Sequence, residues 1–328
     1  GRPRTMPSFA VNVDDAMDLV AYIWNRASPI LETSGPASNA TNDIPPEERE
    51  RGEALFLTVG CLACHQHGSL GQAGDLNGGD LTSIGEKRVP SFFTTWLKTP
   101  ERLQAQHRMP VFALTDDEAS ALTSFLRTCS ADSRAHEEST DEPPDWVFDQ
   151  QRILRGQRRF AALRCGNCHD ATDDVGIVPL SAIDATKVDD HCGSSVANGD
   201  RPAFGLSPQH AEVLRNALPR IVQRTKPIMA KLPDDWLALT GCTNCHARGR
   251  HQGLAPVVRE VIAAHPKIAT DASAMVPPTL KSIGSKLTHE VLRETVLGHH
   301  RVRPYLKVRM PHYRQLDASE RNRSLSAL

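Results

Sequence analysis

The sequence predicts a mostly α-helical protein of three tandem small domains, with the C-terminal fragment of a fourth domain at its N-terminus. Three observations support this prediction. The string Cys-x-x-Cys-His occurs three times in 328 residues, and each copy follows a stretch with the character of a short helix. Each copy also precedes a proline-containing loop and a region of helical character. Because such self-similarity indicates one structural unit per copy, we place the units at residues 46–130, 148–222 and 230–328.

The helix that opens each unit is predicted from residues at fixed distances ahead of the motif. Gly52 and Phe56 lie nine and five residues before the first cysteine of the first motif, and Gly156 and Phe160 lie at the same distances before the second. In the third copy a proline and a leucine stand at these positions. The repeat is therefore present in all three units but unevenly preserved.

The helix that closes each unit follows a Met-Pro or related loop. In MPVFALTDDEASALTSFL, residues 109–126, Thr115 and Glu118 have the spacing of a capping box, and apolar residues recur at helical spacing. Residues 309–328 repeat this pattern with Asp317 as the expected N-cap. Polar segments at 32–48 and 130–146 have the composition of linkers between units.

A fourth copy of this ending lies near the N-terminus, in RTMPSFAVNVDDAMDLVAYIW, without a Cys-x-x-Cys-His string ahead of it. We expect residues 1–30 to be the loop and helix of a further domain. The rest of that domain either lies upstream of Gly1 or has decayed. The first alternative is preferred, because half a domain would leave an apolar helix face exposed to water.

Composition limits the classes of partner. Lys and Arg number 38 and Asp and Glu 39, so charge gives no reason to expect a nucleic acid as partner. The sequence contains no run of about 18 apolar residues, so it predicts no transmembrane segment. Aromatic residues make up only 5% of the chain. So few large side chains are not enough to fill three hydrophobic cores by themselves, so we expect a bound group to contribute to each core.

The three motifs indicate what that group is. Two thiols three positions apart can add to the two vinyl groups of one haem, and the adjacent imidazole can then bind the iron. A zinc site or a thioredoxin-like dithiol does not explain a histidine after every pair. The predicted attachment residues are Cys61, Cys64, Cys165, Cys168, Cys242 and Cys245, and the predicted proximal ligands are His65, His169 and His246.

Together, the motifs, the Met-Pro loops and the closing helices resemble class I c-type cytochromes. In that family the helix before the motif packs against the C-terminal helix, and a loop methionine supplies the second axial ligand. The resemblance implies three covalently attached haem c groups, with Met109 on the first haem and Met310 on the third. It implies that Met6 serves a haem outside this chain. It also implies a periplasmic or otherwise exported protein.

The middle unit departs from this pattern, because Arg201 stands where a methionine is expected and a guanidinium cannot donate a lone pair to iron. The sixth position of that haem is either open or filled by another side chain. His191 and Cys192 are nearest in sequence, and His210 and Met229 are further candidates. An arginine near the haem can stabilise an anionic ligand or pair with a propionate.

Two cysteines fall outside the motifs. Cys129 and Cys192 either form a disulfide or remain separate buried thiols. In a third alternative, Cys192 is an iron ligand. The sequence leaves these alternatives open.

The function expected from the whole pattern is electron transfer between redox protein partners. A haem enzyme is the first alternative, peroxidase-like or acting on small nitrogen or sulfur compounds, with the middle haem catalytic and Arg201 and His191 beside it. A docking subunit of a larger respiratory complex is the second. Other subunits, or a missing N-terminal domain, are possible partners in either case.

Overall fold

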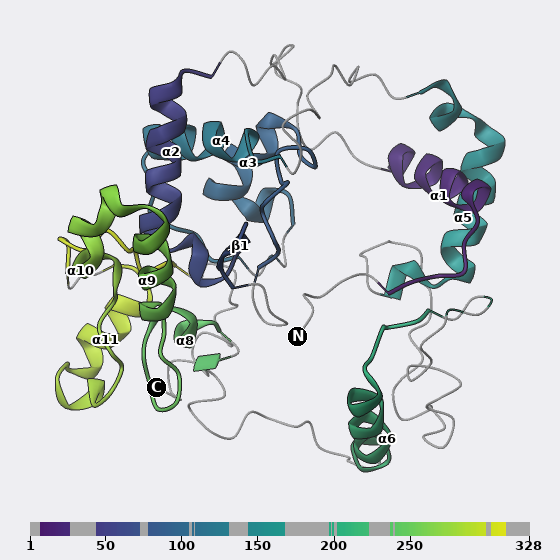
Figure 1. Ribbon diagram of the computed structural model, residues 1–328. Coiled ribbons are helices and arrows are strands. Elements are labelled where there is room, and N and C mark those ends of the chain that lie inside the picture. Colours follow the sequence, from purple (N-terminus) through teal and green to yellow (C-terminus); the bar gives the residue numbers. More distant parts are fainter. Residues whose placement is uncertain are drawn as a thin grey trace. The chain divides into compact units, whose positions relative to one another are not determined.

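A computed structural model describes much of the chain and shows it to be mostly helical (Figure 1). No described helix is long and apolar enough to cross a membrane. The chain divides into two units, one holding Ile30–Glu138 and Ala230–Leu328, and the other Thr5–Pro29 and Ser139–Met229. The described residues are 7–26, 44–72, 78–104, 107, 109–130, 144–167, 197, 199, 202–222, 237–238, 240–299 and 303–312.

The first part of unit 1 contains the first motif between two long helices. Helix α2 starts with Pro46 in its first turn, where a missing N–H costs nothing. It ends at Val59, and the C-cap Gly60, with φ of 121°, turns the chain toward the motif. Helix α4 begins at a capping box between Thr115 and Glu118, as the sequence predicts. The elements here are α2 (Pro46–Val59), β1 (Gln66–His67), β2 (Leu70–Gly71), α3 (Pro90–Lys98) and α4 (Asp116–Arg127).

Helices α2 and α4 cross at a glycine. A Cβ added to Gly52 would lie 2.0 Å from the carbonyl oxygen of Ala121 and 2.8 Å from the Cβ of Phe125. Only glycine allows the two backbones to approach this closely. Next to the crossing, the rings of Phe56 and Phe125 pack with their centroids 5.3 Å apart. The helix before the motif therefore packs on the helix after the Met-Pro loop, as the resemblance implies for the first domain.

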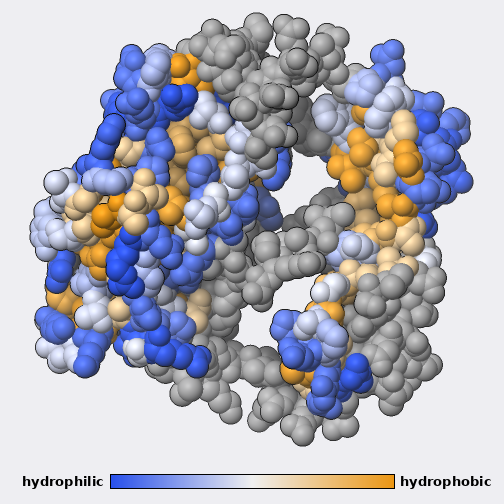
Figure 2. All heavy atoms as spheres, in the orientation of Figure 1, coloured by the Kyte–Doolittle hydropathy of each residue, from blue (hydrophilic) through white to orange (hydrophobic). Residues whose placement is uncertain are grey.

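The second part of unit 1 shares its core with the first part. Val257, Val261 and Met275 belong to the same buried cluster as Phe56 and Leu62. Figure 2 shows hydrophobic residues gathered where α9 and α10 meet α2. Parts of the first and third predicted domains thus join in one core, which the linker composition does not predict. The helices of this part are α8 (Cys242–Cys245), α9 (Ala255–Ala264), α10 (Ala272–Met275) and α11 (His289–Val296).

Unit 2 contains the second motif and the N-terminal segment. Its helices are α1 (Val13–Arg26), α5 (Gln150–Ala162) and α6 (Pro208–Val222). Helix α1 crosses α5, as Figure 1 shows, and the amide of Asn25 donates to the carbonyl of Val147 at 2.7 Å. The sequence predicts that residues 1–30 belong with a haem outside the chain, whereas the structure gives α1 a helical partner within it.

Candidate haem sites

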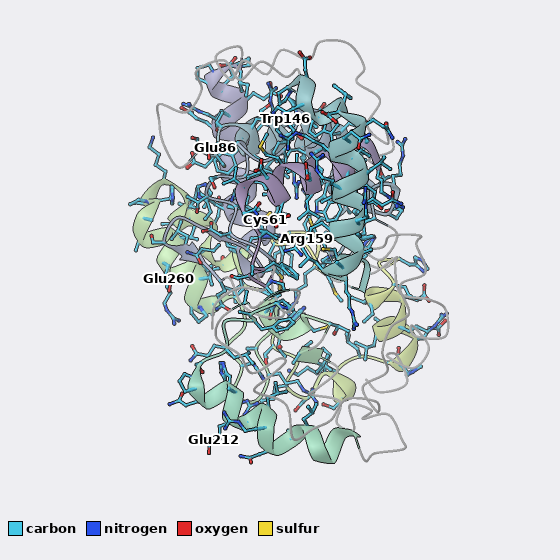
Figure 3. All side chains as sticks on the ribbon, turned by 90° about the vertical axis from the view of Figure 1, so that its right-hand side faces the viewer. Cys61, Glu86, Trp146, Arg159, Glu212 and Glu260 are labelled. Carbon is cyan, nitrogen blue, oxygen red and sulfur yellow. The ribbon has the colours of Figure 1, made fainter. Side chains whose placement is uncertain are left out.

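The first motif follows directly from the end of α2. Cys61 opens a short 3-10 turn, and the backbone N–H groups of Cys64 and His65 donate to its carbonyl at 3.1 and 3.0 Å. Cys61 is labelled in Figure 3, and its free thiol is partly buried. The Nδ1 atom of His65 lies 2.9 Å from the carbonyl oxygen of Gly79. Because a carbonyl only accepts, Nδ1 carries the hydrogen and Nε2 keeps its lone pair for a metal.

The third motif repeats this arrangement on a separate part of the chain. Gly241, with φ of 77°, precedes α8, and the N–H of His246 donates to the carbonyl of Cys242 at 2.9 Å. The Nδ1 atom of His246 lies 2.7 Å from the carbonyl oxygen of Pro278. The same hydrogen bond therefore fixes the same tautomer in both motifs, although the segments that supply the carbonyl differ in sequence.

Burial keeps both histidines in the form that binds metal. Desolvation lowers the pKa of His65 and the pKa of His246. The hydrogen bond that each Nδ1 donates, to the carbonyl of Gly79 or of Pro278, opposes this effect. A neutral imidazole is the form that ligates iron. Burial also raises the pKa of the Cys61 thiol and of the Cys245 thiol to about 12.

These residues fit haem c. The first and third motifs each offer two thiols and an imidazole whose free nitrogen is oriented by a hydrogen bond from the other ring nitrogen to the backbone. The cysteines Cys61, Cys64 and Cys245 pack at the edge of the buried apolar cluster of unit 1. Thioether attachment at such an edge would place an apolar porphyrin against the core.

The first and third motifs lie side by side. The amide of Asn244, inside the third motif, donates to the sulfur of Cys64 at 3.4 Å. After burial, the nearness of Cys64 is the next cause that raises the pKa of the Cys245 thiol. Across the part of the chain that is described, no three His, Cys, Asp or Glu side chains are grouped so as to hold a metal ion.

The two Met-Pro loops of unit 1 pair with each other. Val111 and His312 form an antiparallel bridge, with N–H to carbonyl distances of 2.9 and 2.8 Å. Met109 is partly buried against the core of the unit, whereas Met310 is 39% exposed. Iron ligation by either sulfur stays a prediction.

Two contacts around these loops were not found by sequence reasoning. The buried imidazole of His107 places Nδ1 2.8 Å from the carbonyl oxygen of Met109. The guanidinium of Arg309 donates to Glu118 at 2.7 and 2.5 Å and to the carbonyl of Ala113 at 2.7 Å. Position beside a Met-Pro dipeptide is the one signal in the sequence that points to His107 and Arg309.

Most of the second motif lies outside the described residues. Cys165 opens a short 3-10 turn at residues 165–167, after α5. His210 lies exposed on α6. Cys129 is a buried free thiol, and burial raises its pKa to about 12. The disulfide alternative also involves Cys192, which lies outside the described residues, so it stays a prediction. The residues outside the description are Met6, Cys168, His169, His191, Cys192, Arg201 and Met229.

Comparison with known proteins supports the assignment of the first site. Neither the search of curated proteins nor the search of solved structures found a match. Residues 49–130 match the family model described as Cytochrome c. This match covers α2, the first motif, Met109 and α4. It supports a c-type cytochrome domain there, with covalently bound haem c, iron and haem-based electron transfer as its chemistry.

Proposed function

We propose that this chain is a multihaem c-type cytochrome that transfers single electrons between redox protein partners through three covalently bound haem c groups, in the periplasm or an equivalent exported location. The arrangement shared by His65 and His246 supports this most strongly, because each imidazole is oriented by a backbone carbonyl and keeps Nε2 for iron. The family match extends the support at the first motif.

When bound, haem c supplies an iron centre that gains and loses one electron. The chain's residues do the rest. The cysteines would tether the group, the histidines would ligate its iron, and the apolar core would keep water away. Met109 and Met310 are proposed as the second iron ligands of the first and third sites, since a thioether ligand raises the reduction potential and suits electron transfer.

The adjacency of two motifs supports a relay within unit 1. Asn244 contacts the sulfur of Cys64, so the two tethering strings touch inside one core. Electron transfer slows steeply as the distance between centres grows. Tethering at touching positions therefore favours exchange between the first and third sites.

The test is to count haems on the denatured, purified protein by mass spectrometry. We expect the mass of three haem groups, and one fewer when both cysteines of any single motif become serine. Cys129→Ser is the matched control, because it removes a buried free thiol outside the motifs and should leave the count at three. A protein without covalent haem after export in a host competent for haem attachment would overturn the proposal.

A second measurement separates electron transfer from catalysis. We expect the ferrous protein to bind no carbon monoxide and its haems to exchange electrons with a chemical oxidant such as ferricyanide. We also expect removal of the third attachment site to shift the midpoint potential of the first haem. Carbon monoxide binding with turnover of peroxide would instead identify a haem enzyme.

A further inference from the structure

Helix α1 lies across α5 in the same register that α4 keeps across α2. A Cβ added to Gly156 would lie 1.9 Å from the carbonyl oxygen of Asp18 and 2.8 Å from the Cβ of Tyr22. The rings of Tyr22 and Phe160 pack with centroids 5.3 Å apart, the same separation as in the α2–α4 pair. Gly52 and Gly156 therefore each allow a second helix to approach the backbone closely, and an aromatic pair packs beside each crossing.

The matching contacts stand at matching distances along the sequence. Ala121, which meets Gly52, lies twelve residues after Met109, and Asp18, which meets Gly156, lies twelve residues after Met6. The aromatic partner follows four residues later on both closing helices. Gly52 and Gly156 each stand nine residues before their motif. Helix α1 thus has the register of the closing helix of the second haem domain.

Ion pairs make the α1–α5 contact specific. Asp18, which is 6% exposed, accepts from Arg152 at 3.0 Å and from Arg155 at 2.7 and 3.0 Å. Hydrogen bonding to Arg155 lowers the pKa of Asp18 against the effect of its burial. Arg159, labelled in Figure 3, lies 3.4 Å from Asp15. A carboxylate buried with two arginines fixes which helix can occupy this position.

The helix that follows Arg201 lacks these features. At twelve residues after Arg201, α6 presents Val213, which is 65% exposed, and at sixteen residues it has alanine instead of an aromatic residue. The carbonyl oxygen that meets Gly156 comes from α1 and not from α6. Sequence order would make α6 the closing helix of the second domain, but the structure gives that place to α1.

The loops ahead of these helices are joined in the same way in both units. Ser8 and Ala203 form an antiparallel bridge with N–H to carbonyl distances of 2.9 and 2.8 Å, matching the bridge between Val111 and His312. Each bridged residue lies two positions after the Met or Arg of its loop. Loop and helix are therefore placed together at the N-terminus, as they are in the first domain.

We propose that the N-terminal segment completes the second haem domain and that Met6 is the sixth ligand of the haem held at Cys165 and Cys168. This inference rests on the proposed function. It is argued from the register of α1 on α5, since Met6 itself lies outside the described residues. It replaces the expectation that Met6 serves a haem elsewhere, and it gives each of three motifs one Met-Pro loop. The second haem then has a thioether ligand although Arg201, which cannot ligate iron, stands in its own loop.

The first test removes the thioether from the holoprotein. With methionines labelled by ¹³C at the methyl group, the ferrous wild type should show three methyl signals moved far upfield by the haem ring currents. Met6→Ala should lose one of them and gain carbon monoxide binding at one haem in three. Met17→Leu is the matched control, because it removes a thioether from α1 itself, and it should keep all three shifted signals.

The second test displaces α1 without touching Met6. Gly156→Val should drive α1 away from α5 and produce the same loss of one shifted signal, whereas Gly284→Ala, where an added Cβ meets nothing within 4 Å, should change none. Loss of the signal in both Met6→Ala and Gly156→Val supports the proposal. Three shifted signals in Met6→Ala, or two in the wild type, would overturn it.

The haem count keeps the two proposals distinguishable. Fewer than three haems on the denatured wild type would contradict the proposed function. Three haems on the wild type and on Met6→Ala, with unchanged methionine signals and no carbon monoxide binding, would leave that function standing and refute the assignment of Met6 alone. The second haem would then take its sixth ligand from another residue, and His191→Ala would identify the nearest candidate.

Discussion

The guanidinium of Arg309 donates a hydrogen bond to each carboxylate oxygen of Glu118, at 2.7 and 2.5 Å. Arg309 immediately precedes Met310, and Glu118 lies in the first turn of α4, the helix that follows Met109. The pair therefore ties the loop of the third site to the closing helix of the first. The N–H of Arg309 also donates to the carbonyl of Val59, at the end of α2, at 2.9 Å.

We predict that this pair makes the stability of unit 1 depend on acid pH. Its hydrogen bonds to Arg309 lower the pKa of Glu118 from 4.5 to about 2. A depressed carboxyl pKa contributes stability above the unfolded value, and this contribution is lost as pH falls from about 4.5 toward 2. Glu118→Gln keeps the capping-box geometry and removes the charge, so it should cost about 2 kcal/mol at neutral pH. Most of this cost should disappear as pH falls toward 2.

Thermal unfolding followed from pH 7 to pH 2 measures this effect. The curves of the wild type and Glu118→Gln should converge at low pH, whereas Asp116→Asn, at an exposed site on the same turn, should follow the wild type. A constant difference between wild type and Glu118→Gln across the whole range would contradict the prediction.

We predict that Gly52→Val strongly destabilises unit 1. The added Cβ would lie 2.0 Å from the carbonyl oxygen of Ala121, a backbone atom that cannot move without separating α2 from α4. The expected cost is about 3 kcal/mol in the free energy of unfolding. Denaturant titration measures it. Gly284→Ala provides the control, and equal midpoints for the two variants would show that the crossing is not tight.

We predict that Gly78→Ala disturbs the proximal ligand of the first haem. An added Cβ would lie 2.2 to 2.6 Å from three atoms of the His65 ring, so the imidazole must shift. Gly79→Ala is matched to it, because its added Cβ meets nothing within 4 Å. We expect a high-spin ferric EPR signal from about one haem in three for Gly78→Ala. The signal should be absent from Gly79→Ala, and its absence from both would count against the His65 assignment.

We predict that His107 positions Met109 as a ligand. Its Nδ1 atom contacts the carbonyl oxygen of Met109 at 2.8 Å, and the ring is 3% exposed. His107→Ala should weaken the Met-to-iron charge-transfer band of one haem by several fold, since the loop loses the contact that orients it. His107→Asn can still donate to that carbonyl and should restore part of the band. Equal loss in both variants would indicate a packing role only.

The sequence alone predicted the attachment chemistry and determined the helices beside the first motif. The Cys-x-x-Cys-His strings are local, and their spacing decides their geometry, as the matching turns at Cys61 and Cys242 show. The capping box of Thr115 and Glu118 is local too, and it was predicted correctly. Helix α1 was likewise expected from apolar residues at helical spacing.

Tertiary structure alone decided which closing helix meets which opening helix. Sequence order assigns α6 to the second domain, yet Gly156 meets Asp18 of α1, which lies 138 positions earlier in the chain. The contact depends on a backbone approach at glycine, an aromatic pair and a buried carboxylate that faces two arginines. Each of these three contacts joins residues far apart in sequence, and no local sequence pattern specifies which residues pair. For the same reason Glu118 could be recognised as a cap, but not as the partner of Arg309.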